Sequence, residues 1–245
     1  LAGIYTLAQN IASLIQAPQR GVISSSIGPL SQAWKNKDLA RINRIYHSSS
    51  INQLIFSVAM FALIWMNFND AVLNFHLQHR YLEAAMVFFY IGLMRIVDMG
   101  TGVNSQIIVT STFWRFDFIT GIILLALTLP LNYVFTKYYF GVTGPAIANL
   151  ISLTVYNLIR YWFLYARFAM QPFSLKTLYT LLLGIGGYVL SYYVFRDMHG
   201  FAGMILRSAL FVFVFVSGVK WLELSPDVKP VWQTMLKKLG IKKGD

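Results

Sequence analysis

Two charged side chains, Arg95 and Asp98, lie in the middle of the apolar stretch formed by residues 83–115. A charged side chain at the centre of a bilayer costs about 2.5 to 3.5 kcal/mol on insertion scales, so such residues usually face a protein partner or a wet cavity. Arginine also presents a fixed fork of donors that matches the oxygens of a phosphate. The stretch is therefore a candidate cavity wall that could bind an anion.

The polar residues of this stretch recur at helical spacing. Arg95, Asp98, Gly102, Ser105 and Gln106 fall on one face of a 3.6-residue helix, and the opposite face is mostly apolar. Two interpretations are open. Either this face lines a cavity, or Arg95 and Asp98 form an internal ion pair that only neutralises its own charge. The polar residues of the other predicted helices distinguish between these interpretations.

The composition predicts an integral membrane protein. Hydrophobic residues make up 57% of the chain and charged residues 12%, with a mean hydropathy of +0.58, whereas soluble domains contain about 25% charged residues. The absence of cysteine excludes disulfides, thiolate metal sites and a cysteine nucleophile. The chain opens LAGIYTLAQN, without Met or the basic region of a signal peptide, so we expect a fragment of a longer protein.

Seven segments have the roughly 20 mostly apolar residues that a spanning helix needs. They are residues 4–30, 49–69, 83–115, 118–136, 145–165, 177–195 and 203–221. The sequence therefore predicts an all-α, polytopic membrane helix bundle of about seven transmembrane helices over residues 1–223. Residues 224–245 are predicted to form a basic, amphipathic cytoplasmic tail that binds the anionic membrane surface, with packing on the bundle as the alternative.

Basic residues are distributed unevenly between the predicted loops. One side holds Lys35, Lys37, Arg41, Arg44, Arg115, Arg167, Lys176, Lys220 and the tail lysines, and the other holds only Arg80, Lys137 and Arg196. The positive-inside rule places the richer side and the C-terminus in the cytoplasm. The positive-inside rule then accounts for the net charge of +11, which indicates no nucleic-acid partner. Residues 35–46 are expected to lie as an amphipathic helix on the inner leaflet, with Asp38 as a cap.

Polar stripes also mark three other predicted helices. They comprise Gln9, Ser13, Gln16, Arg20 and Ser24; Ser49, Asn52, Gln53 and Ser57; and Pro145, Asn149, Ser152, Tyr156 and Arg160. One stripe alone could be interhelical hydrogen bonding, at about 0.6 to 2 kcal/mol per bond. Several stripes with deep arginines favour a hydrated cavity. The candidate substrate-binding residues are Arg20, Arg95, Asp98, Gln9, Gln16, Gln106, Asn52 and Asn149, with no catalytic residue, metal ligand or cofactor expected.

Two motifs carry a family resemblance. Residues 3–46, GIYTLAQNIASLIQAPQRGVISSSIGPLSQAWKNKDLARINRIY, resemble the Gly-Ile-Tyr-x-x-Ala helix, Pro-x-x-Ser end and Lys-Asp-containing helix of polysaccharide flippases. Residues 139–152, YFGVTGPAIANLIS, resemble that family's Tyr-x-Gly-x-x-Gly-x-Ala-Ile-Ala start, although Pro145 replaces a common small residue. The chain is similar to oligosaccharide and O-antigen flippases of the multidrug/oligosaccharidyl-lipid/polysaccharide superfamily.

The resemblance implies a function and a partner. Such flippases move polyprenyl-diphosphate-linked sugars across the bacterial cytoplasmic membrane for surface polysaccharide and lipopolysaccharide synthesis, and consist of two pseudo-symmetric lobes. This chain would be the C-terminal lobe, and its N-terminal lobe would be its partner. The resemblance further implies that basic cavity residues meet the diphosphate, for which Arg20 and Arg95 are the candidates by position.

Other function classes remain open. A cation-coupled multidrug exporter would share the fold, with Asp98 as the deep carboxylate for coupling. A membrane glycan polymerase or acyltransferase is disfavoured, because it needs a sizeable outer loop or a committed acid/base set. The longest outer loop, residues 70–82, contains His76 and His79 without a third zinc ligand nearby. A purely structural scaffold is the last alternative, and we expect no enzymatic activity.

Overall fold

The computed structural model describes residues 2–225, which contain helices and no β-strand, in agreement with the predicted all-α class. The elements are α1 (Ala2–Ser13), η1 (Leu14–Gln16), α2 (Gln19–Lys35), α3 (Leu39–Asn74), η2 (His79–Glu83), α4 (Ala84–Gly100), α5 (Asn104–Val109), α6 (Trp114–Val134), η3 (Phe135–Phe140), η4 (Gly141–Thr143), α7 (Gly144–Phe168), α8 (Leu175–Val194) and α9 (Gly200–Trp221). All but the first two residues of the predicted tail lie outside the described residues.

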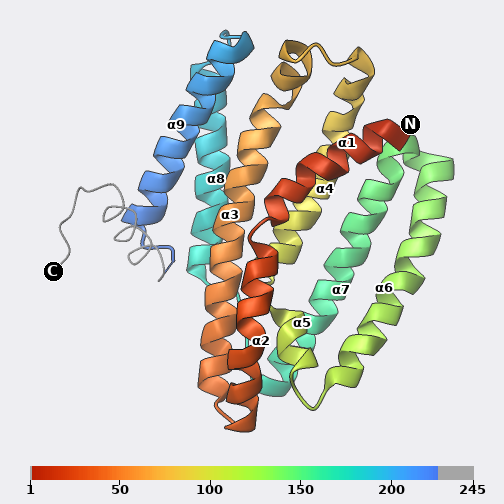
Figure 1. Cartoon of the computed structure of the whole chain (residues 1–245), viewed down its shortest axis with the longest axis vertical. Helices are drawn as coiled ribbons and strands as arrows, with labels where there is room; N and C mark the ends of the chain where they lie inside the picture. The colour runs from red at the N-terminus through yellow and green to blue at the C-terminus, as the bar shows by residue number, and fades with distance from the viewer. Residues whose placement is uncertain (1, 226–245) are drawn as a thin grey trace.

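Within residues 2–225, four helical segments are long and apolar enough to cross a membrane: Leu39–Asn74, Trp114–Phe168, Leu175–Val194 and Gly200–Trp221. They are the helices of a multi-pass membrane protein. The segment Trp114–Phe168 contains α6 and α7, which run side by side and are joined through η3 and η4 (Figure 1). The other predicted spans correspond to shorter helices, because α1, α2 and α4 have 12, 17 and 17 residues.

The first predicted span is not one helix. It breaks into α1 and α2 around Pro18, and α1 is tilted away from the direction of α2 (Figure 1). Proline lacks a backbone N–H and its ring clashes with the preceding turn, so it ends a regular helix. The prediction of a continuous helix over residues 4–30 is therefore wrong at its middle. Consequently Gln9 and Gln19 belong to different helices.

The third predicted span is also broken, between α4 and α5. Gly102 adopts a positive φ of 63°, and a Cβ there would lie 2.9 Å from the backbone nitrogen of Ser50. Such a conformation and such an approach both favour glycine. Two hydroxyls of α3 satisfy the freed backbone groups: Ser50 donates to the carbonyl of Gly100, and Ser49 accepts from the N–H of Val103 at 3.3 Å. Ser49, which belongs to the second predicted stripe, and its neighbour Ser50 are thus structural.

The predicted inner-leaflet helix over residues 35–46 is instead the end of α2, a turn and the first turns of α3. Asp38 caps this helix as expected, accepting from the backbone N–H of Arg41 at 2.9 Å. Ile42 and Tyr46 are fully buried in a cluster that includes Leu30 and Val103. Ile42 and Tyr46 therefore pack on the bundle, whereas Leu39 of the same predicted face is 43% exposed. At about 1.5 Å per residue, α3 is also longer than the roughly 30 Å hydrocarbon core.

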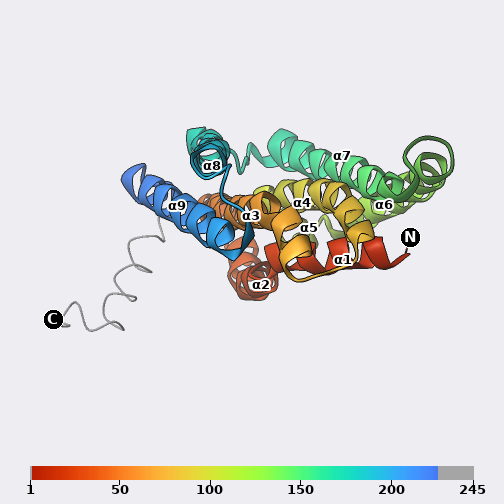
Figure 2. The ribbon, with the colours of Figure 1, turned by 90° about the horizontal axis from the view of Figure 1, so that it is seen from above.

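α3 and α4 form the centre of the bundle, because α4 packs against α1, α3 and α7, and α3 also packs against α2. Seen from above, α1 and α2 form one layer, α3 and α4 the next, and α7 and α8 the layer behind them (Figure 2). α8 and α9 pack on α3. Large apolar side chains are exposed on α6 to α9, including Leu129, Trp162, Phe213 and Trp221. An apolar surface of this extent fits contact with lipid.

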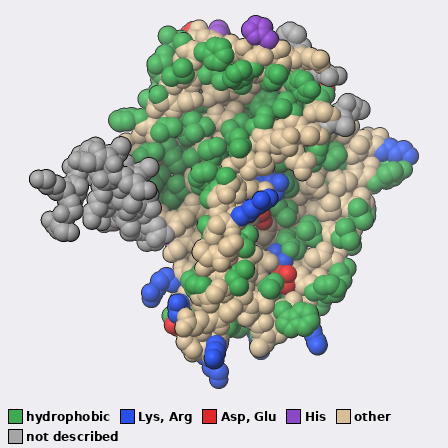
Figure 3. Space-filling model, viewed as in Figure 1, with side chains coloured by type: hydrophobic (Ala, Val, Ile, Leu, Met, Phe, Trp, Pro, Cys, Tyr) green, Lys and Arg blue, Asp and Glu red, His purple; other side chains and the backbone are tan. Residues whose placement is uncertain are grey.

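The two ends of the bundle differ in charge. Several basic side chains lie along the lower part of the face shown in Figure 3, others lie near its middle, and histidine side chains lie at the upper end. Lys37 lies in the lower turn, and Tyr139, with 71% of its side chain exposed, lies in η3 at the upper end (Figure 1). The charge difference predicts that the Lys37 end is cytoplasmic.

Single cysteines test this orientation in a chain that has none of its own. In intact cells, we expect Tyr139→Cys to react with a membrane-impermeant thiol reagent and Lys37→Cys to react only after the cells are opened. Equal labelling of both variants in intact cells would contradict the orientation.

Candidate functional site

Arg95 lines a cavity of about 260 Å³ among four helices. The polar residues of its wall come from α1, α4, α6 and α7, and the rest of the wall is apolar. The polar lining consists of Tyr5, Gln9, Arg95, Thr128 and Asn149. Three of the predicted binding residues, which belong to three separate helices, therefore meet at one cavity.

The guanidinium of Arg95 is incompletely satisfied. Its Nε atom is buried and has no hydrogen-bond partner within residues 2–225. Most buried polar atoms in proteins are paired, so an unpaired one indicates a functional group or an absent partner. The neighbouring amide of Asn149 is held in place: its nitrogen donates to the hydroxyl of Tyr5 at 3.3 Å, and its oxygen accepts from Asn132 at 3.3 Å. The cavity thus places the cationic Arg95 beside the neutral, hydrogen-bonded side chains of Asn149 and Tyr5.

Asp98 lies one helical turn after Arg95 but is bound to other residues. Its carboxylate accepts from the amide of Gln19 at 2.9 Å and from the amide of Asn157 at 3.3 Å. The described residues contain no Arg95–Asp98 ion pair, so the self-neutralising pair is not formed. Asp98 therefore ties α2, α4 and α7 together, and Arg95 remains available to the cavity.

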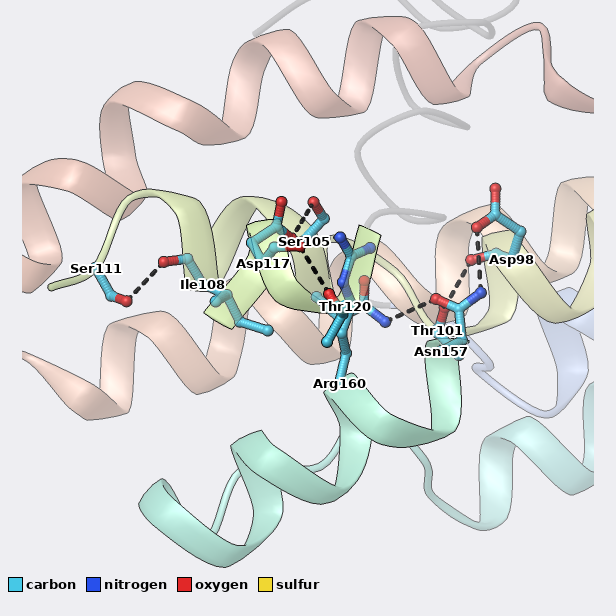
Figure 4. Close-up of polar contacts among 10 residues, drawn as sticks. Asp98, Thr101, Ser105, Ile108, Ser111, Asp117, Thr120, Asn157 and Arg160 are labelled. Carbon is cyan, nitrogen blue, oxygen red and sulfur yellow. Dashed lines mark hydrogen bonds and ion pairs between the residues drawn. The ribbon is translucent and has the colours of Figure 1, made fainter. Parts of the chain in front are cut away.

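Asn157 extends this network into the break between α4 and α5. Its carbonyl oxygen accepts from the hydroxyl of Thr101 at 3.1 Å and from the amide of Asn104 at 2.9 Å (Figure 4). Thr101 also donates to the backbone carbonyl of Asp98 at 2.8 Å. One buried side chain of α7 thus fixes the residues on both sides of the break.

A buried ion pair lies one turn farther along α7. Arg160, only 4% exposed, pairs with Asp117 at the start of α6 (Figure 4). Ser105 donates to the same carboxylate oxygen at 3.1 Å, and the guanidinium carbon of Arg160 lies 3.7 Å from the ring centroid of Tyr156. The Nε atom of Arg160 has no hydrogen-bond partner within residues 2–225, but its ion pair with Asp117 makes it a structural cation that joins α5, α6 and α7.

The remaining predicted residues lie outside the cavity. Gln16 donates to Gln19 at 2.9 Å and so joins the Asp98 network. Asn52 of α3 accepts a hydrogen bond from the hydroxyl of Ser225 and does not line the Arg95 cavity. Arg20 is exposed on α2, and neither its side chain nor that of Gln106 makes a hydrogen bond within residues 2–225. The structure thus separates Arg20 from the cavity lining that contains Arg95.

Several residues of the network were not singled out from the sequence: Gln19, Thr101, Asn104, Asp117 and Asn157. Asn157 carried a usable signal, because it follows Asn149 by eight residues and so lies on the same face of α7. Thr101 and Asn104 could not be identified from the sequence, because their positions depend on the break between α4 and α5. Asp117 falls between the predicted spans 83–115 and 118–136, yet it lies in the first turn of α6 and pairs with Arg160.

No protein-family model, curated protein or solved structure matches this chain. Among residues 2–225, no group of three or more His, Cys, Asp and Glu side chains is placed to hold a metal ion. What the site can do therefore follows from its geometry: it offers a cationic donor, oriented amides and hydroxyls to a ligand that carries negative charge.

The buried Arg160–Asp117 pair makes a stability prediction. Asp117→Leu leaves a buried guanidinium without its counter-charge, which we expect to lower the free energy of unfolding by about 3 to 5 kcal/mol. Adding Arg160→Leu removes the orphaned charge and should recover most of that loss. Unfolding in detergent, followed by circular dichroism, measures both effects.

The matched control is the exposed pair of Arg196 and Asp197, whose side chains are 63% and 94% exposed. Asp197→Leu should change stability by less than about 1 kcal/mol, because exposed ion pairs contribute little. A single Asp117→Leu variant as stable as the control would contradict the structural role of the pair.

Proposed function

We propose that this chain is one lobe of a flippase that moves polyprenyl-diphosphate-linked oligosaccharide across a bacterial cytoplasmic membrane for cell-surface polysaccharide synthesis. The observation that carries the proposal is that Arg95, whose buried Nε atom has no hydrogen-bond partner within residues 2–225, lines a polar cavity in a multi-pass membrane protein. In this proposal Arg95 binds the diphosphate. Asn149, Gln9 and Tyr5 bind neighbouring oxygens and hydroxyls of the substrate.

The charges of the cavity favour an anionic group. Of the polar residues that line it, Arg95 is the only one with a formal charge, because Asp98 is held by Gln19 and Asn157 outside the lining. A guanidinium binds a phosphate through two parallel hydrogen bonds, which combine charge and geometry. A multidrug cation would find no carboxylate in this lining. The cavity therefore favours the flippase over the multidrug exporter.

The size of the cavity supports a second lobe. Pockets that enclose small ligands usually measure about 300 to 1,000 Å³, and the Arg95 cavity measures only about 260 Å³. It can hold a diphosphate-sized part of the substrate but not an oligosaccharide. In the proposal, an N-terminal lobe completes the binding site and this chain alone does not transport.

The broken helices support transport as well. Secondary transporters bind substrate near discontinuous helices, and one half of the molecule rocks against the other. Here α1 and α2 break around Pro18, α4 and α5 break at Gly102, and Gln19 and Asp98 join the two breaks. If each broken pair crosses the membrane once, the chain crosses it seven times and the C-terminus is cytoplasmic.

A conservative substitution tests the role of Arg95. In proteoliposomes that contain both lobes, Arg95→Lys should lower the flipping rate of lipid-linked oligosaccharide at least about tenfold, because lysine keeps the charge but loses the bidentate geometry. The melting temperature should change little, since Arg95 forms no ion pair to lose within residues 2–225.

Arg167→Lys is the matched control, because Arg167 is exposed near the end of α7, away from the cavity. It should flip at the normal rate. If Arg95→Lys also flips normally, Arg95 does not bind the diphosphate and the proposal loses its main support.

A further inference from the structure

A second polar cavity, of about 300 Å³, lies where α3 ends and α9 begins. It shares no lining residue with the Arg95 cavity. Figure 1 shows these ends together with the end of α8 at the top of the bundle. We propose that this cavity binds a sugar ring. The key lining residues are Trp65, Asp70, Tyr188, Tyr192, His199 and Arg207.

A fixed pair of charged groups supplies the polar contacts. Asp70 and Arg207 form an ion pair whose side chains are only 16% and 5% exposed. The Nε atom of Arg207 also donates to the carbonyl of Gly203 at 3.1 Å, which sets the plane of the guanidinium. A carboxylate that accepts beside a guanidinium that donates matches two neighbouring hydroxyls of a sugar, each of which can donate and accept.

Aromatic rings supply the apolar contact. Tyr188 and Tyr192, one turn apart on α8, stack with their centroids 5.9 Å apart and their planes 13° apart. Trp65 of α3 belongs to the same wall. Aromatic rings offer a rigid apolar body with a polar tip, and their electron-rich faces attract positively polarised edges. The C–H face of a sugar ring fits such a surface, while its hydroxyls reach Asp70 and Arg207.

The charge balance favours a neutral sugar over a phosphate. Arg207 is already paired with Asp70, and the exposed Arg196 lies 3.6 Å from the carboxylate of Asp197. The carboxylate of Asp70 within the lining would repel an anion. A mixed set of donors and acceptors beside aromatic rings therefore indicates a polyhydroxy ligand.

The ion pair is not needed simply to fasten α9 to α3. Two other contacts already do so: Asn67 donates to Ser208 at 2.9 Å, and Asn74 donates to the sulfur of Met204 at 3.3 Å. Asn67, Asp70 and Asn74 lie on one face of α3, and of these three only Asp70 lines the cavity. The charged pair thus lies where a ligand can reach it.

Saturation-transfer NMR on the protein in detergent tests the proposal with glucose and N-acetylglucosamine as the probes. We expect saturable binding of at least one of them in the millimolar range. Tyr192→Leu should weaken it at least about tenfold, because it removes the stacking ring but keeps an apolar side chain. Tyr193→Leu is the control, since Tyr193 is 62% exposed and does not line the cavity.

Each other outcome overturns the proposal. No saturable signal with either sugar, or equal weakening by Tyr192→Leu and Tyr193→Leu, would show that no sugar binds here. Displacement of the bound sugar by millimolar inorganic phosphate would make this an anion site instead. The assay needs no transport, so its result is separate from the role proposed for Arg95, and the melting temperature of Tyr192→Leu shows whether the variant is folded.

Discussion

The carboxylate of Asp98 is the constraint on which the centre of this bundle depends. An ionised group in apolar surroundings must be hydrogen-bonded, and Asp98 obtains its donors from Gln19 of α2 and Asn157 of α7. Those two bonds fix three helices around the breaks at Pro18 and Gly102. Because neutral amides satisfy Asp98, Arg95 does not have to neutralise it. The free guanidinium at the cavity is thus a consequence of how the carboxylate is held.

The same rule accounts for the other polar contacts between helices. The break after α4 exposes backbone groups, and Ser49 and Ser50 of α3 satisfy them. Arg160 is buried with Asp117, and Arg207 with Asp70. Of these three buried or half-buried arginines, only Arg95 forms no ion pair within residues 2–225. That difference, and not depth alone, marks Arg95 as the candidate for binding an anion.

The sequence predicted the helical class and the apolar segments, because apolar runs and helical spacing are local properties. It did not place the breaks. Pro18 ends a regular helix by its own chemistry and was a local signal, whereas the break at Gly102 depends on the close approach of Ser50 of α3. For the site, the spacing of Gln9, Arg95 and Asn149 on separate helices predicted one cavity, and their side chains do line one. It could not show that Arg20 is turned away or that Asn157 connects the network, since both depend on how helices rotate.

The central claim is that the Arg95 cavity binds the diphosphate of the lipid-linked sugar. Photo-crosslinking in cells tests it most directly, with a photoreactive amino acid in place of Gln9, which lines the cavity, and in place of Leu129, which is 62% exposed on α6. Mass spectrometry then identifies the attached lipid. The account predicts polyprenyl-diphosphate-linked oligosaccharide at position 9 and only phospholipid at position 129. The same lipids at both positions would contradict it.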